Sequence, residues 1–406
     1  MTHRASWIFA ALLLAVLCVA GYREATLRAP ASLGPDQEEY LASGVAAYEE
    51  QVFFWKAPLY SLWLAAFYRI SGGDAARYAR LEKGVSVLLL ALMLGALAWR
   101  LIDGRTGLLA VFWTLQCKYL LVEPNNSHTL AAILFASSGL CLLTLKPAQR
   151  LPAALFALFL AAQVRAEMWL VLGGVIAILF LREGWERLRE KRRTTLFAAG
   201  SVWWGVGLAL ALGVWTLFHF RQGSENHYRL LDEAFAQNFA ANYVERNGLE
   251  AQYPSPWRSC HEIRRTVMPG AEGLVDAIRL HPGIVAAHIR HNVRVSLRAI
   301  PASVLGIDRK GLWALVVGLY LVSYLVTWTA PSTTTGWSRL SEEQKWQLGA
   351  LAGSTIALVL STWLFRAAAR YYIQLIPVLL PALALALHWI LGNRMRIHDQ
   401  RHSSCL

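Results

Sequence analysis

Long apolar runs alternate with short polar segments along most of this chain. A helix that crosses the hydrocarbon core of a bilayer needs about 20 consecutive apolar residues. The pattern therefore predicts an all-α, polytopic membrane protein with about ten transmembrane helices. The predicted spans are 7–20, 85–99, 108–122, 130–145, 151–164, 168–181, 196–217, 312–328, 348–364 and 372–391. The fifth and sixth are short, so one long kinked helix is the alternative there.

Composition supports the membrane prediction. Of the 406 residues, 56% are apolar and 16% are charged, whereas soluble proteins have roughly 45–50% and about 25%. Such a chain is neither intrinsically disordered nor a small disulfide-stapled domain. The formal net charge of +13 would fit a nucleic-acid partner, but the basic residues lie between the apolar runs. We therefore expect the lipid bilayer as a partner and no nucleic acid.

Basic residues gather in alternate segments between the runs. They are Arg4, Arg100, Arg105, Lys146, Arg150, the cluster 182–193, Arg394, Arg396 and Arg401. Because Lys and Arg mark cytoplasmic loops, a ten-span arrangement with both termini in the cytoplasm accounts for all of them. The first run also resembles a secretory signal, and its cleavage would leave nine spans in the same orientation. The residue usage favours a bacterial inner membrane.

The same arrangement places five segments on the external face. They are 23–83, 123–128, 165–167, 219–310 and 365–371. We expect one domain over residues 1–406, with 23–83 as its first external loop and 219–310 as a long external segment before the last three spans. Within these segments, Pro58–Ile70 and Tyr228–Tyr243 have the pattern of amphipathic helices that lie in the membrane interface.

Carboxylates lie close to the first span, at Asp36, Glu38 and Glu39, and Tyr40 follows them. A carboxylate that is partly desolvated at a membrane surface has a raised pKa, which suits a general base. The alternative is a solvated helix start with Asp36 as its N-cap.

After the carboxylates, two further candidate groups for a functional site consist of cations with aromatic neighbours. Lys56 precedes Pro58 and Tyr60, and Arg366 and Arg370 lie four residues apart before Tyr371. Such side chains bind phosphate through charge-assisted hydrogen bonds. Interfacial anchoring is the alternative for both groups.

Arg165 and Glu167 interrupt two apolar runs, and charges at such depth face protein or water. A structural ion pair and a functional role stay open for them. Glu123 lies in a tight external loop with Asn125, Asn126 and His128, where a turn is the alternative. The sequence has no Cys/His spacing typical of zinc and no P-loop, which argues against an ATP-driven pump.

Taken in chain order, these motifs resemble the GT-C class of polytopic glycosyltransferases. The nearest pattern is that of the family of protein O-mannosyltransferases and the lipid A aminoarabinose transferase. The matching positions are Asp36 and Tyr40, Lys56 with Pro58, Leu59 and Tyr60, Gly72, Arg77 or Arg80, residues 103–107, Arg165 to Glu167, His281-Pro282 and Arg370 to Tyr372. The chain departs from the family pattern at Gln37, where the family has Glu, and at Ala57, where it has Pro.

The resemblance implies transfer of a sugar from a polyprenyl-phosphate donor to a lipid, glycan or protein acceptor at the external face, with inversion. In this scheme Asp36 is the base, with Glu38 and Glu39 as substitutes, and Lys56, Arg366, Arg370 and Tyr371 bind the donor phosphate. Tyr40, Tyr60, Arg165, Glu167 and Glu123 support the site. No cofactor is expected, and a divalent metal stays open.

Two other functions compete with this one. A secondary transporter or lipid flippase would concentrate its charges near the bilayer midplane, whereas the predicted spans leave them at the ends. A non-catalytic relative of the glycosyltransferase fold is the other alternative, favoured by the departures at Gln37 and Ala57.

Overall fold

The structure is a computed structural model in which every regular element of the described residues is a helix. The described residues are 15–16, 18–27, 35–49, 58–117, 120–121, 127–190, 201–219, 227–305, 336–365, 369–383 and 385. The all-α prediction is confirmed for this part of the chain. The predicted span 312–328 and both chain termini lie outside it, so the predicted location of the termini is not tested.

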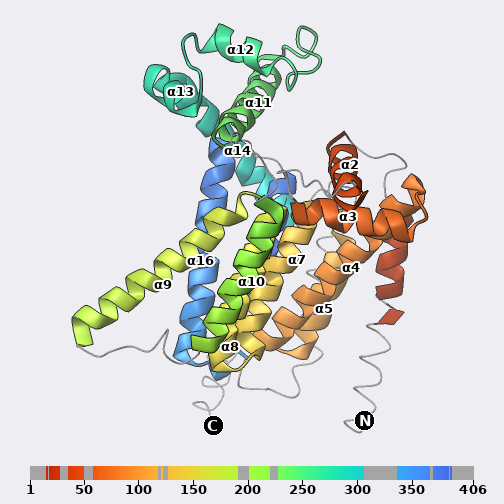
Figure 1. The fold of residues 1–406 in the computed structure, drawn as a ribbon, viewed down its shortest axis with the longest axis vertical. Coiled ribbons are helices and arrows are strands. Elements are labelled where there is room, and N and C mark those ends of the chain that lie inside the picture. Colours follow the sequence, from red (N-terminus) through yellow and green to blue (C-terminus); the bar gives the residue numbers. More distant parts are fainter. Residues whose placement is uncertain are drawn as a thin grey trace, which may run out of the picture.

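The described part of the chain forms a helical bundle (Figure 1). Its helices include α4 (Ala75–Leu101), α5 (Gly104–Gln116), α7 (Ser127–Thr144), α8 (Pro147–Val164), α9 (Met168–Glu190), α10 (Ser201–His219) and α16 (Glu342–Leu364). Among the residues that the structure describes, four segments are long and apolar enough to cross a membrane: Arg77–Leu101, Ser127–Thr144, Met168–Trp185 and Glu342–Leu364. They coincide with the predicted spans 85–99, 130–145, 168–181 and 348–364. The protein is therefore an α-helical protein with the character of a membrane protein, and the count of ten spans stays a prediction.

Two predicted spans differ in detail. The segment predicted at 108–122 is the 13-residue helix α5, which ends at Gln116 because Cys117 adopts an extended backbone conformation. The segment predicted at 372–391 begins as the 3₁₀ helix η2 (Ala369–Leu375) and continues as an apolar helix to Leu383. Helix α8 covers the predicted span 151–164, and α10 covers the described part of the predicted span 196–217, from Ser201 onward.

Small residues let α4 and α5 approach closely. A Cβ atom added at Gly95 would lie 2.4 Å from Val111 Cγ2, and one at Gly107 would lie 2.8 Å from the carbonyl oxygen of Gly95. Glycine at such positions is typical of helix contacts within membranes. Buried Leu90, Leu94 and Phe135 then fill the core of the bundle.

One end of the bundle carries two short helices, α2 (Pro35–Glu49) and α3 (Pro58–Ile70). Helix α3 lies across the ends of the bundle helices, and α2 lies beyond it (Figure 1). The prediction of a helix at Pro58–Ile70 is confirmed. The turn predicted at Arg165–Glu167 is also confirmed, because α8 ends at Val164 and α9 begins at Met168.

A separate helical subdomain projects from the same end (Figure 1). It contains α11 (His227–Asn247), α12 (Cys260–Val267), α13 (Leu274–Leu280) and the start of α14 (Pro282–Leu305). The helix predicted at Tyr228–Tyr243 is confirmed as part of α11. Its location in the membrane interface is corrected, because buried Phe235 and Phe239 pack into a core made with α12, α13 and α14. The apolar face of α11 is therefore covered by protein.

Candidate functional site

The first two sequence motifs meet where α2 contacts α3. The rings of Tyr40 and Tyr60 pack edge to face with their centroids 5.2 Å apart, and the two side chains are 4% and 0% exposed. Gly44 lies so close to α3 that a Cβ atom there would be 2.0 Å from the Ser61 carbonyl oxygen. This contact holds the carboxylate segment against the helix that follows the predicted lysine motif.

The carboxylates of α2 that the structure describes are accessible. Glu38 and Glu39 are both exposed. Helix α2 begins at Pro35, a residue favoured in the first helical turn, so Asp36 lies within that turn rather than at the N-cap. The side chain of Asp36 is outside the described part of the structure.

The predicted phosphate-binding residues are only partly described. Lys56, Glu123 and Arg366 lie outside the described residues, and Arg370 and Tyr371 belong to η2 with side chains that are not described. That these residues and the carboxylates of α2 lie together in one site therefore stays a prediction.

Arg165 and Glu167 form an ion pair at the turn between α8 and α9. Arg165 Nη2 lies 2.6 Å from Glu167 Oε1, and the side chains are 16% and 22% exposed. The backbone N–H of Arg165 also donates to the Ala161 carbonyl and closes the end of α8. This geometry agrees with the structural alternative, and a functional role is not tested.

The structure adds two buried ionisable residues that the sequence interpretation missed. Glu82 and Lys83 are each 1% exposed in the third turn of α4. Glu82 Oε1 accepts hydrogen bonds from Trp63 Nε1 at 3.2 Å and from Ser86 Oγ at 3.0 Å. Their position at the edge of an apolar run was the available signal, because a charge there is costly unless protein surrounds it.

A second polar network joins α14 to the carboxyl end of α16. His288 Nε2 donates to the carbonyls of Leu364 and Phe365, at 3.0 and 2.9 Å. Asn292 Nδ2 donates to the Trp363 carbonyl at 2.8 Å, and its Oδ1 accepts from Asn242 Nδ2 at 2.7 Å. Burial lowers the pKa of His288 to about 4. The neutral imidazole thus satisfies carbonyls that a helix end leaves without partners.

The late motif contacts three helices, α14, α16 and α7. Tyr372 hydrogen-bonds to Ser296 of α14, and its hydroxyl lies 2.9 Å from Thr362 Oγ1 of α16. Gln374 Nε2 lies 3.0 Å from His128 Nδ1 at the start of α7. These contacts place η2 at the same end of the bundle as α3 (Figure 1).

Buried polar atoms without hydrogen-bond partners gather at this end, among the residues that the structure describes. They come from α3, the first turns of α4 and α7, the last turn of α8, and η2. They are Ser61 Oγ, Tyr78 OH, Thr129 Oγ1, Gln163 Nε2 and Gln374 Oε1. Fewer such atoms lie elsewhere: Arg150 Nε and Gln347 Oε1 at the opposite end, and Asn238 Oδ1 and Arg264 Nε in the subdomain. Because buried polar groups are nearly always hydrogen-bonded, this concentration favours a polar ligand at the α3 end.

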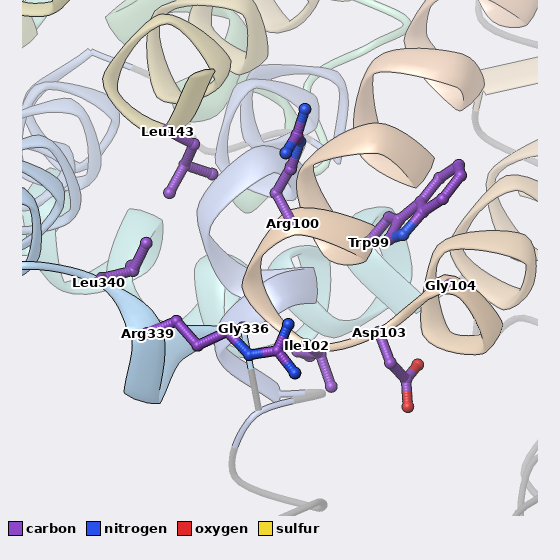
Figure 2. A pocket seen from close by; sticks show the side chains of 9 residues that line it. All are labelled: Trp99, Arg100, Ile102, Asp103, Gly104, Leu143, Gly336, Arg339 and Leu340. Carbon is purple, nitrogen blue, oxygen red and sulfur yellow. The ribbon is translucent and has the colours of Figure 1, made fainter. Parts of the chain in front are cut away.

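A pocket of about 400 Å³ lies at the opposite end of the bundle (Figure 2). Its lining is Trp99, Arg100, Ile102, Asp103, Gly104, Leu143, Gly336, Arg339 and Leu340. Asp103 accepts a hydrogen bond from the Thr106 backbone at 2.7 Å and so caps α5. In the predicted orientation this pocket faces the cytoplasm, and none of the predicted site residues lines it.

One group of described residues has the side chains of a metal site. Glu233, Cys260 and His261 offer three ligand atoms that all lie within 4.8 Å of one another. They belong to α11 and α12, away from the contact between α2 and α3.

Comparison of the chain with protein-family models, curated proteins and solved structures finds no match. The resemblance to GT-C glycosyltransferases therefore rests on the sequence motifs.

Proposed function

We propose that this protein is a membrane glycosyltransferase that uses a polyprenyl-phosphate-linked sugar. The observation that carries the proposal is the gathering of polar groups at one end of an apolar helical bundle. Exposed carboxylates on α2, the buried pair Glu82 and Lys83, and five buried polar atoms without partners lie at that end. A lipid-linked donor needs this combination, since its prenyl tail requires apolar helices and its phosphate and sugar require polar groups.

In the proposed reaction, a carboxylate of α2 removes the proton of the acceptor hydroxyl while that oxygen attacks the anomeric carbon. Asp36 is the proposed base, and Glu38 or Glu39 substitutes for it. Lys56, Arg366 and Arg370 stabilise the charge of the departing lipid phosphate, and Tyr371 supports them. The proposed site lies at the external face of a bacterial inner membrane. The acceptor is a lipid, a glycan or a protein.

The distribution of charge disfavours a secondary transporter or flippase. Five stretches of the bundle helices contain no Asp, Glu, Lys or Arg, namely residues 84–99, 127–144, 151–164, 168–181 and 346–364. Transporters place such groups near the bilayer midplane, in broken helices. The non-catalytic alternative stays open to the experiment below.

The test compares a deletion strain with strains that carry the wild-type protein or Asp36→Asn. Mass spectrometry of polyprenyl-phosphate lipids and envelope glycans should show a glycan that loses one sugar and a donor lipid that accumulates. Asp36→Asn should reproduce the deletion at wild-type protein level, and Glu250→Gln, on an exposed turn of the external segment, should restore the glycan.

A membrane-impermeant reagent distinguishes the alternatives in intact spheroplasts. Loss of a transferase leaves the accumulated donor accessible from outside, whereas loss of a flippase leaves it inside. If deletion changes no lipid or glycan, the enzymatic proposal fails and a non-catalytic relative remains.

A further inference from the structure

The helical subdomain at the end of the bundle brings together three side chains of the kinds that bind transition metals. Glu233 lies on α11, while Cys260 and His261 are the first two residues of α12. Residues 248–259 connect the two helices. Packing of α12 on α11, rather than a short sequence motif, makes them neighbours, which is why the sequence interpretation assigned no ligand role to these residues.

The carboxylate of Glu233 lies at the centre of the group. Its Oε2 is 2.8 Å from His261 Nε2, and its Oε1 is 3.7 Å from Cys260 Sγ. Two different oxygens thus face the imidazole and the thiol. The chemistry of the three ligands is the carboxylate, imidazole and sulfur set found in zinc sites.

The spacing agrees with tetrahedral coordination. Metal–ligand distances of about 2.0–2.3 Å separate the ligand atoms of a tetrahedron by roughly 3.3–3.7 Å. The distance between sulfur and carboxylate is already in this range. An ion would replace the hydrogen bond between Glu233 and His261 and move those two side chains apart by a few tenths of an ångström.

The three side chains of the group differ in solvent exposure. Cys260 is 1% exposed and packs in the subdomain core, whereas the side chains of His261 and Glu233 are 50% and 38% exposed. The sulfur is therefore packed against the subdomain core on one side, and solvent reaches the site on the side of His261 and Glu233. Gln237 Nε2 donates to Glu233 Oε1 at 2.9 Å, a second contact of the kind that orients metal ligands.

We propose that Glu233, Cys260 and His261 bind one zinc-type divalent ion, with water as the fourth ligand, and that the ion fastens α12 to α11. The ligand atoms come from two helices, so the bound ion links elements that are otherwise held by the small core around Phe235 and Ile263. An ion that binds only the folded subdomain stabilises it by mass action.

Cobalt(II) provides the test, because its visible spectrum reports tetrahedral geometry and its near-ultraviolet charge-transfer band reports a thiolate ligand. The full-length protein in detergent is stripped with a chelator and titrated with Co²⁺, and Zn²⁺ is then added. We expect one equivalent of Co²⁺ with a thiolate band that Zn²⁺ abolishes. Cys260→Ser should eliminate the band.

Two further variants keep the test independent of the core position of Cys260. His261→Gln and Glu233→Gln change partly exposed side chains, and each should weaken Co²⁺ binding by more than the about 10- to 100-fold typical of losing an outer-shell hydrogen bond. The controls are Cys141→Ser in α7 and His281→Gln, whose Nε2 lies 2.8 Å from the Pro269 carbonyl in the same subdomain. Both should bind as the wild type does.

Three results would overturn the proposal. The first is wild-type protein that gives no thiolate band, which would leave the group as an ion pair beside a core cysteine. The second is a band that survives in Cys260→Ser. The third is unchanged affinity in both His261→Gln and Glu233→Gln.

Discussion

Glu82 illustrates how a single side chain constrains the end of the bundle. The sequence places it just before the apolar run that begins at Val85, and the structure buries it between α3 and α4 with 1% exposure. Its carboxylate accepts from the Trp63 indole of α3 and from the Ser86 hydroxyl of α4. Because a buried carboxylate is costly without donors, the contact with Trp63 favours this position of α3 on α4.

Replacing Glu82 by Ala should destabilise the protein. The change leaves the partly buried Trp63 N–H without its acceptor, and an unsatisfied donor costs up to about 1–3 kcal/mol when it is fully buried. We expect a lower unfolding temperature in detergent, measured by scanning fluorimetry. Glu82→Gln keeps an acceptor oxygen and should lower it less, and exposed Glu250→Ala should leave it unchanged. Equal unfolding temperatures for all three variants would show that Glu82 does not hold α3.

His288 should make stability depend on pH. Its pKa is about 4 in the folded protein because it is buried, whereas an unfolded histidine titrates near about 6.5. Between these values the unfolded chain binds more protons, so stability falls as the pH is lowered from 6.5 to 4. The full effect is on the order of 3 kcal/mol. Above pH 6.5 both states are neutral and His288 contributes no slope.

Unfolding temperatures measured from pH 7 to pH 4 check this prediction. The wild type should lose stability across that range by more than His288→Gln does, since glutamine can donate to the Phe365 carbonyl but does not titrate. Parallel curves for the two proteins would contradict the buried, neutral state of His288. Arg246 and the titratable His291, which also act on His288, are present in both proteins and serve as the common background.

At the scale of elements, the sequence predicted helix bounds and turns best where local residues alone determine them. Pro58–Ile70 was predicted with the bounds that α3 has, because a proline begins it and a polar Ser-Gly-Gly segment follows it. The turn at Arg165–Glu167 was predicted because two charges interrupt apolar runs. The prediction that lipid covers the apolar face of α11 was wrong, since apolar periodicity shows that a face is buried but does not show whether lipid or another helix covers it.

In the candidate site, too, local motifs could be predicted from the sequence, whereas contacts between distant residues could not. The sequence assigned Tyr40 and Tyr60 to one site, and their rings are in contact in the structure, while the role of that site stays a prediction. Glu82, His288 and the group around Glu233 were not predicted. Each has at least one partner that is 19 or more residues away in the sequence, and no local pattern encodes such pairs.

Gly44→Ala tests the packing of α2 on α3. The new methyl group would lie 2.0 Å from the Ser61 carbonyl oxygen, and α3 backbone cannot give way as a flexible side chain can. We expect a lower unfolding temperature and reduced sugar transfer. Gly173→Ala in α9 is the matched control, because nothing lies within 4 Å of its added Cβ. There alanine should be neutral or stabilising by about 0.5–1 kcal/mol. A neutral or stabilising effect at Gly44 would rule out the close contact.

At the scale of the whole molecule, exposed apolar side chains lie along the bundle helices, and charged side chains lie at the helix ends. Large apolar side chains are exposed on the outward faces of α9, α10 and α16, including Leu181 at 74%, Leu208 at 62% and Ile356 at 63%. A soluble protein rarely exposes contiguous apolar surface of this kind. Charged residues instead occupy the ends, as in the pairs of Arg165 with Glu167 and of Arg182 with Glu343. The bundle thus has the surface of a protein embedded in lipid.

The orientation of the bundle is the remaining prediction at this scale, and single cysteines test it. Ala166 is exposed in the turn between α8 and α9, and Ser338 is exposed in η1 (Trp337–Arg339), before α16. Lys and Arg favour the cytoplasm, which predicts that Ala166 is external and Ser338 internal. In a background without the five native cysteines, an impermeant maleimide should label Ala166→Cys in intact spheroplasts. It should label Ser338→Cys only after the membrane is opened. The reverse pattern would place the α3 end, and with it the proposed site, in the cytoplasm, where a donor presented outside cannot reach it.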